Sequence, residues 1–177
     1  MSLCDSLAGI DKDCLNSIGG IQEVYIADRD AIDSVTESGG TITAITMATG
    51  ETFHSFAFTR DTSNFNETPE VDVANGSTLF NQIVTLMVKR REVAKRNAIM
   101  LLAAGQRDLA VIIKDNNGRY ELAGYANDFS QGLQLTGGEG GTGSAKSDMN
   151  GYTIELTNQM PEMAFEVDPT IIPGLLP

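Results

Sequence analysis

Short segments in which apolar and polar residues alternate run through most of this chain. In 152–158 (YTIELTN) the first, third and fifth residues are apolar and those between them are polar. Because successive side chains of a strand point to opposite faces, this pattern predicts a half-buried β-strand. Comparable segments, separated by turn residues, lie at 21–28, 42–48, 52–60, 65–74, 79–88, 109–114, 119–126, 129–135 and 163–167. The chain is therefore predicted to be mostly β.

Turn residues and apolar patterns indicate where several of these strands lie in a sheet. Pro69 cannot donate to a hydrogen-bond ladder, so the strand at 65–74 is expected at a sheet edge. Asn117-Gly118 tolerates the positive φ of a tight turn and predicts a hairpin between 109–114 and 119–126. Apolar residues of both parities in 79–88 predict a strand that is covered on both faces.

One segment, 92–104, has a helical period instead. Val93, Ala98 and Leu102 belong to a set of apolar residues that we place on one helix face, with Glu92 opposite. Gly105 follows as a stop signal. The sequence thus predicts a single α-helix.

The length and net charge of the chain limit its domain organisation and its binding partners. The 177 residues suffice for one β-rich domain, 21–167, preceded by an N-terminal segment, 1–20, and followed by an extended, proline-rich tail, 168–177. A net charge of −12 repels phosphate backbones and argues against tight nucleic-acid binding. Without a signal sequence or membrane span, we expect folding in the cytoplasm, where Cys4 and Cys14 stay reduced.

Residues suited to catalysis are scarce. His54, the one histidine, shares the parity of Phe56 and Phe58, which predicts a packed side chain. Gly138-x-Gly140-x-x-Gly143 fits a dinucleotide pattern but is not followed by a helix. Asp28, Asp30 and Asp33 lack the full spacing of a calcium loop. We expect no enzymatic activity, no catalytic residue, no cofactor and no metal.

Three features are candidates for contacts between subunits. The basic group at 89–96 is either a solvated face, a surface that meets acidic neighbouring copies, or a nucleic-acid patch. The segment 136–151 is rich in glycine and is expected to be a long loop. The tail carries aliphatic residues that need a partner surface. From these features the candidate interface residues are Arg91, Lys95, Arg96, Thr136, Gly138, Gly140, Gly143, Ile171, Ile172, Leu175 and Leu176.

The order of elements resembles the tube-protein fold of phage tails and type VI secretion tubes. The segments 14–27 (CLNSIGGIQEVYIA), 115–122 (DNNGRYEL) and 150–156 (NGYTIEL) also resemble structural proteins of phages that infect Bacteroidetes, including the crAss-like group. The likeness covers residues 14–167 and carries turns and strand edges, with no catalytic signature. It implies a two-sheet β-sandwich or barrel with one helix.

The same resemblance implies a virion subunit that folds in the bacterial host cytoplasm. It would form a hexameric ring of the tail tube or head-to-tail region with copies of itself and contact neighbouring virion proteins. DNA would pass through the ring without tight binding, and no membrane is involved. The alternative is a β-sandwich module, not an enzyme, that displays the 136–151 loop to a ligand. Oligomeric state distinguishes the two.

Overall fold

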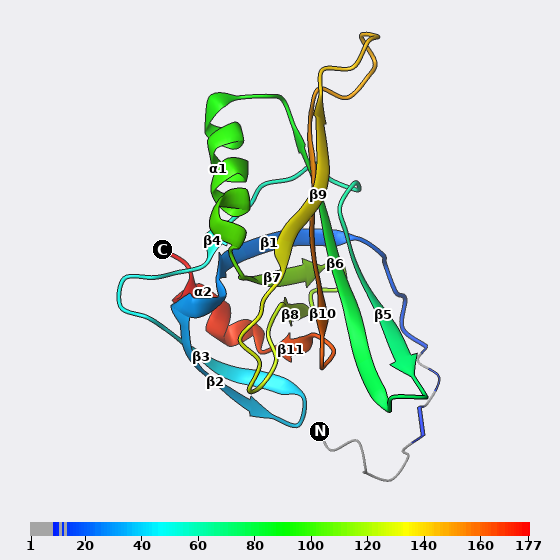
Figure 1. The fold of residues 1–177 in the computed structure, drawn as a ribbon, viewed down its shortest axis with the longest axis vertical. Coiled ribbons are helices and arrows are strands. Elements are labelled where there is room, and N and C mark those ends of the chain that lie inside the picture. Colours follow the sequence, from blue (N-terminus) through cyan, green and yellow to red (C-terminus); the bar gives the residue numbers. More distant parts are fainter. Residues whose placement is uncertain (1–8, 11, 13) are drawn as a thin grey trace.

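Two β-sheets form the body of the protein (Figure 1). The computed structural model describes residues 9, 10, 12 and 14–177. The larger sheet has the strand order β2-β3-β11-β8-β7-β1-β4. Its strands are β1 (Ile21–Asp28), β2 (Ile32–Ser38), β3 (Thr41–Met47), β4 (His54–Ser55), β7 (Leu109–Asp115), β8 (Tyr120–Ala123) and β11 (Phe165–Val167).

The smaller sheet has the order β5-β6-β10-β9 and is antiparallel throughout. Its strands are β5 (Asn64–Asp72), β6 (Ser77–Lys89), β9 (Gln134–Gly141) and β10 (Gly151–Met160). The helical elements are α1 (Val93–Ala103), α2 (Ile172–Leu175) and the 3-10 turns η1 (Arg29–Ala31), η2 (Ala104–Gln106) and η3 (Pro169–Ile171).

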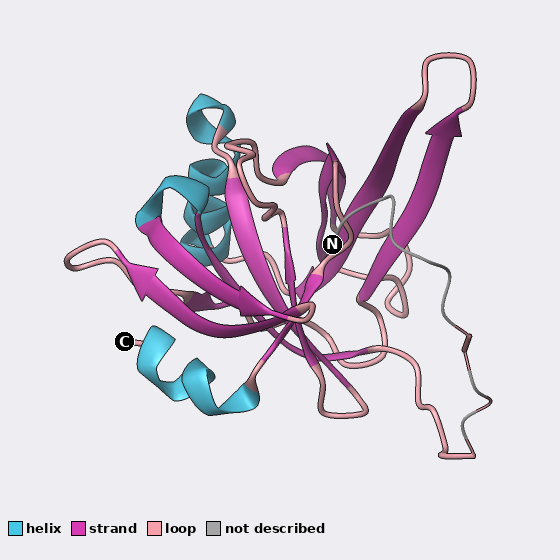
Figure 2. Ribbon diagram, turned by 90° about the horizontal axis from the view of Figure 1, so that it is seen from below, coloured by secondary structure: helices cyan, strands magenta, loops and turns pink. Residues whose placement is uncertain are grey.

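The seven-stranded sheet is covered on both faces, and β7 shows how. Its residues 109–113 are all buried. Leu109, Val111 and Ile113 join the core that the two sheets share with α1. Ala110 and Ile112 join a second core beneath the C-terminal helical turns. Figure 2 shows helical turns on opposite sides of this sheet.

Strand β11 links two parts of the larger sheet. It lies between β3 and β8, parallel to β3 and antiparallel to β8. The β2–β3 hairpin is therefore joined to the other strands of its sheet through three residues near the C-terminus.

The mostly-β, two-sheet prediction is confirmed. Strands make up 49% of the chain and helices 14%, and the sheets stay separate instead of closing into a barrel. Pro69 lies on edge strand β5, as predicted. The hairpin turn at 115–118 is confirmed as well, with Asp115 N donating to Arg119 O at 2.9 Å. In the part of the chain that is described, no helix is long and apolar enough to span a bilayer.

Several strand predictions are wrong in extent. Only His54 and Ser55 of the segment 52–60 are in a strand, and 129–132 is loop before β9 begins. The prediction of a packed His54 side chain is also wrong. His54 is exposed, whereas Phe53, of the opposite parity, is fully buried. Strand β2 was not predicted. Strand β6 buries only one face fully, that of Gln82, Val84 and Leu86.

The position of helix α1 is confirmed, but only part of the predicted apolar face is buried. Leu102 is buried and Ile99 packs on the shared core, whereas Val93 and Leu101 are 74% and 59% exposed. Apolar residues occur on two sides of this helix, so periodicity alone could not identify the side that meets the sheets.

The tail is helical, which corrects the prediction of an extended segment. The Asp168 side chain caps η3 by accepting from Thr170 N at 2.8 Å. Ile172 and Leu175 are buried in the chain's own second core. Phe53 N donates to Leu175 O at 2.9 Å and fixes α2 against the large sheet. The tail thus completes the second core of this chain.

Candidate assembly interface

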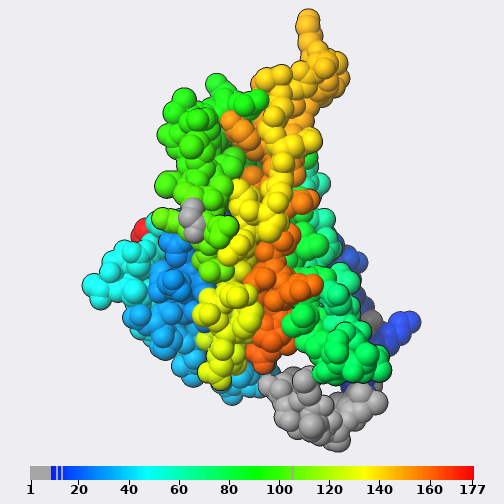
Figure 3. Space-filling model, in the orientation of Figure 1, coloured from blue at the N-terminus to red at the C-terminus, as the bar shows by residue number. Residues whose placement is uncertain are grey.

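The outer face of the four-stranded sheet, which points away from the seven-stranded sheet, is mainly polar. The register places alternate residues of β5, β6, β10 and β9 on this face. They are Asn64, Asn66, Thr68, Glu70, Asp72, Ser77, Leu79, Asn81, Ile83, Thr85, Met87, Lys89, Gln134, Thr136, Gly137, Glu139, Gly141, Thr153, Glu155, Thr157 and Gln159. Four of these are carboxylates and one is a lysine, so the face is polar and acidic. Figure 3 shows the strands side by side in yellow, orange and green.

Both edges of this sheet lack a partner strand within the described chain. Strand β5 forms one edge and is exposed at all but two of its residues. Strand β9 forms the other edge. Edge strands present unpaired N–H and C=O groups, which another chain can pair with. This sheet therefore offers two open edges to neighbours.

The first part of the glycine-rich segment is a strand, which corrects the extent of the loop predicted at 136–151. Residues 136–141 belong to β9 and pair with β10. Gly138 has φ +143°, and a Cβ there would lie 2.3 Å from Thr153 O. Glycine is thus required for this close pairing of β9 and β10.

The tip of the β9–β10 hairpin, residues 142–150, projects beyond the body (Figure 3). Asp148 organises it, since its Oδ2 accepts from Ala145 N and Ser144 N, each at 2.7 Å. These hydrogen bonds hold the pKa of the Asp148 carboxyl below its ordinary value. Gly143, with φ +67°, lies in this turn. The predicted loop is thereby reduced to a short, hydrogen-bonded tip.

A shallow groove of about 370 Å³ separates α1 from the hairpin. Thr136, Gly138 and Gly140 line it from β9, and Ile99 lines it from α1. Tyr152 also lines it, and the Arg91 guanidinium lies 5.2 Å from the centre of the Tyr152 ring. The structure thus brings four of the predicted interface residues to one side of the molecule.

The other predicted interface residues lie elsewhere. Lys95 is half-buried and donates to Lys89 O at 2.8 Å, so it closes the turn before α1. Arg96 is exposed and contacts Asn97. Ile172 and Leu175 are buried beneath the large sheet and Ile171 and Leu176 pack on the same core. These four aliphatic residues pack against the core of their own chain.

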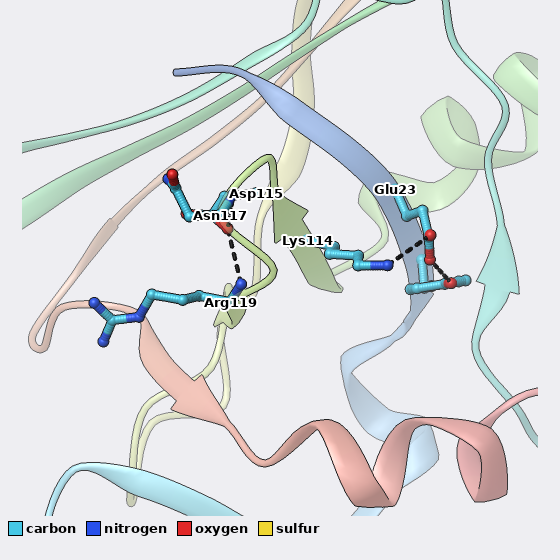
Figure 4. A network of polar contacts seen from close by, with 6 residues as sticks. Glu23, Lys114, Asp115, Asn117 and Arg119 are labelled. Carbon is cyan, nitrogen blue, oxygen red and sulfur yellow. Dashed lines mark hydrogen bonds and ion pairs between the residues drawn. The ribbon is translucent and has the colours of Figure 1, made fainter. Parts of the chain in front are cut away.

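A polar network anchors the start of the domain (Figure 4). Glu23 and Lys114 are register partners on β1 and β7, and Lys114 Nζ lies 2.9 Å from Glu23 Oε1. The Tyr25 hydroxyl also donates to the Glu23 carboxylate. Hydrogen bonds from Tyr25 and Lys114 lower the pKa of Glu23, and the bond to Glu23 raises the pKa of Lys114. The network ties two strands together.

Sequence reasoning missed two polar contacts that organise the fold. Buried Gln82 donates to Glu67 Oε1 at 2.9 Å and accepts from Gly124 N at 2.8 Å, which connects the two sheets. Gln82 alternates in register with Val84 and Leu86, the buried residues of β6, and this spacing was the signal in the sequence for its burial. Asn116 and Asn117 bind the backbone of residues 18–20. The turn pattern predicts no such long-range contact.

Groups of acidic, histidine or cysteine side chains able to hold a metal are not found among the described residues. Cys14 is an exposed free thiol, and Cys4 lies outside the described residues. The acids Asp28, Asp30 and Asp33 are spread over β1, η1 and β2, and Asp28 pairs with Arg107 at 3.2 Å.

No protein-family model, curated protein or solved structure matches this chain.

Proposed function

We propose that this chain is a structural subunit of a phage virion. It assembles with copies of itself into a hexameric ring of the tail tube or head-to-tail region and forms the wall of a conduit for DNA. The observation that carries this proposal is a four-stranded sheet with two open edges and an outer face that is polar and acidic. The sequence resemblance to tail-tube proteins points the same way.

The open edges supply the assembly step. Placing β5 of one copy beside β9 of the next pairs backbone groups that are otherwise left to water. Such a contact joins two different surfaces, and a heterologous contact repeated by rotation closes into a ring. The projecting tip at 142–150 is then placed to reach an adjacent ring or subunit.

The outer face supplies the conduit wall. Neutral amides and hydroxyls offer DNA only weak hydrogen bonds in competition with water, and the carboxylates Glu70, Asp72, Glu139 and Glu155 repel phosphates. Lys89 is the one basic residue of this face. A wall of this composition lets DNA slide without tight binding.

Assembly is tested on the purified protein by light scattering and by cryo-electron microscopy. We expect hexameric rings, stacked rings or tubes. A protein that stays monomeric at high concentration, and also in the presence of virion proteins from the same particle, would contradict the proposal.

Charge reversal tests the orientation of the sheet. Glu139→Lys with Glu155→Lys should give rings that bind DNA with strong salt dependence, because the added lysines face the lumen. The matched control is Asp33→Lys with Glu51→Lys, two exposed acids outside the four-stranded sheet. Equal DNA binding by the two double variants would show that the face does not line the conduit.

A ligand-binding module is the second candidate. A depression of about 690 Å³ lies at the base of β9 and is lined by amide, hydroxyl and carboxylate side chains with one aliphatic residue, namely Asn81, Gln82, Ile83, Asp108, Gln131, Gln134, Thr136, Thr157, Asn158 and Gln159. These groups suit a neutral polyhydroxyl ligand. A monomer that binds such a ligand, with shifts in the NMR signals of Gln131 and Gln134, would favour the ligand-binding module over the ring.

A further inference from the structure

The described residues of the N-terminal arm, 9, 10, 12 and 14–20, leave the body of the protein with their apolar side chains in solvent. All of its described residues are exposed. Ile10 is 99% and Ile18 53% exposed. The end of the arm is fixed in place, because Asn116 and Asn117 hydrogen-bond to the backbone of residues 18–20. Exposed aliphatic groups on a tethered segment favour burial against another surface.

The spacing of the apolar residues in the arm is that of a helix face. Ile10, Cys14 and Ile18 are four residues apart, and the sequence continues the pattern upstream with Leu7 and Leu3. From Ile10 to Ile18 such a helix would rise about 12 Å. Gly19 and Gly20 follow as a helix stop.

Helix α1 has a face that no described residue covers. Val93, Met100 and Leu101 are 74%, 54% and 59% exposed. They are seven and eight residues apart and therefore share the face opposite buried Leu102. This apolar stripe extends over about 12 Å, the same length as the stripe of the arm.

The two segments have opposite charge. Residues 1–20 contain Asp5, Asp11 and Asp13 with one lysine. Residues 89–96 contain three arginines and two lysines with one glutamate. Arg96 lies next to the apolar stripe, and among the described residues its side chain hydrogen-bonds to its neighbour Asn97 alone. An acidic apolar helix fits this basic apolar surface.

The arm and α1 lie on opposite sides of the subunit in both views (Figures 1 and 2). An arm that points away from the α1 of its own chain is suited to reach the α1 of a second copy. The two surfaces are different, so the contact is heterologous and is compatible with ring closure.

We propose that the N-terminal segment of one copy folds into an amphipathic helix against the outward face of α1 in the next copy. Ile10, Cys14 and Ile18 pack on Val93, Met100 and Leu101, and Asp11 and Asp13 face Arg96. The inference rests on the proposed ring, for which it supplies a contact between neighbouring subunits. Folding on binding explains how the arm is exposed in the isolated chain.

The contact is tested without assembly. A fluorescent peptide of residues 1–20 is titrated into protein that lacks residues 1–16, under reducing conditions, and anisotropy and far-UV circular dichroism are recorded. We expect saturable binding with a gain of helical signal. Met100→Ser with Leu101→Ser in the protein should weaken binding about tenfold or more. Met163→Ser, at an equally exposed apolar residue elsewhere, should leave binding unchanged.

Charge reversal gives a second measurement. Arg96→Glu should weaken binding of the natural peptide, and Asp13→Lys in the peptide should restore it. Both protein variants change exposed side chains, and their urea transitions show whether they fold. Absence of peptide binding, or equal affinity for the α1 variants and the control, overturns the inference.

Assembly then separates the two proposals. Rings formed by protein lacking residues 1–16, without peptide binding, would leave the proposed function standing and reject the arm contact. Specific peptide binding by a full-length protein that never forms rings would support the arm contact and reject the ring.

Discussion

Asn117 and Ile18, 99 positions apart in sequence, form two reciprocal hydrogen bonds: Ile18 N donates to Asn117 Oδ1 at 2.8 Å and Asn117 Nδ2 donates to Ile18 O at 2.9 Å. A side-chain amide here imitates a strand partner for the N–H and C=O groups of one residue. The hairpin turn thereby determines where the N-terminal arm leaves the body.

Asn117→Ala should release the end of the arm. Three side-chain hydrogen bonds are lost at an exposed site, two to Ile18 and one to Asp115, so we expect stability to fall by about 1 kcal/mol. Amide hydrogen exchange should show lost protection at Ile18. Asn66→Ala, on exposed strand β5, is the control. Unchanged exchange at Ile18 in Asn117→Ala would show that the arm is held by other contacts.

Leu175→Ala should destabilise the isolated subunit. The side chain is 5% exposed and packs in the second core, and such truncations cost about 2–5 kcal/mol. Urea unfolding measures the change, with exposed Pro173→Ala as the control in the same helix. A subunit of unchanged stability that fails only in assembly would instead restore the view of the tail as an interface.

Gly138→Ala should disrupt the β9–β10 pairing. The residue has φ +143°, and the new methyl group would meet Thr153 O at 2.3 Å, so the strand must shift. Loss of slow exchange at Thr153 and Ile154 would report it. Gly174→Ala is the matched control, because a Cβ at Gly174 has nothing within 4 Å. Retained protection in Gly138→Ala would mean that β9 can move without loss of pairing.

Gln82→Leu should weaken the connection between the two sheets. The substitution leaves Gly124 N without its acceptor and removes a donor from Glu67. An unsatisfied buried group costs about 1–3 kcal/mol. The urea midpoint should fall more than in Gln159→Leu, an exposed glutamine on the outer face of β10. Equal effects of the two changes would argue against this role.

The hairpin tip should loosen in acid. The pKa of Asp148 is lower in the folded tip than in an unfolded chain, so its carboxylate stabilises the tip above the unfolded pKa. That contribution disappears as the pH falls through the lower folded value. NMR signals of Ser144 and Ala145 should shift over this acid range, and Asp148→Asn should abolish the dependence. If the Ser144 and Ala145 signals of Asp148→Asn shifted over the same pH range, another titrating group would be responsible.

Local patterns predicted the elements whose neighbours are close in sequence. The Asn117-Gly118 turn and the edge position of Pro69 follow from backbone chemistry that one residue sets. The polar outer face and buried inner face of β10 follow from its alternation. Of the candidate interface residues, Thr136, Gly138, Gly140 and Arg91 lie close together, which glycine content and charge alone could not show.

Tertiary packing determined the features that local patterns did not predict. Apolar residues on two sides of α1 made its buried face ambiguous, and Leu102 was selected by the sheets it meets. Strand β2 is largely exposed and polar after Ile32, so it shows no clear alternation. The tail forms helical turns because Ile172 and Leu175 find a complementary core, which its prolines do not forbid at the first turn.

The position of β11 between β3 and β8 has a consequence for the time course of biosynthesis. A ribosome must release Val167 before the β2–β3 hairpin can join the rest of its sheet, and the core-filling Leu175 comes later still. A nascent chain that ends before Val167 therefore cannot complete the fold. The β2–β3 hairpin would therefore wait for Val167, and the second core for Leu175, to leave the ribosome.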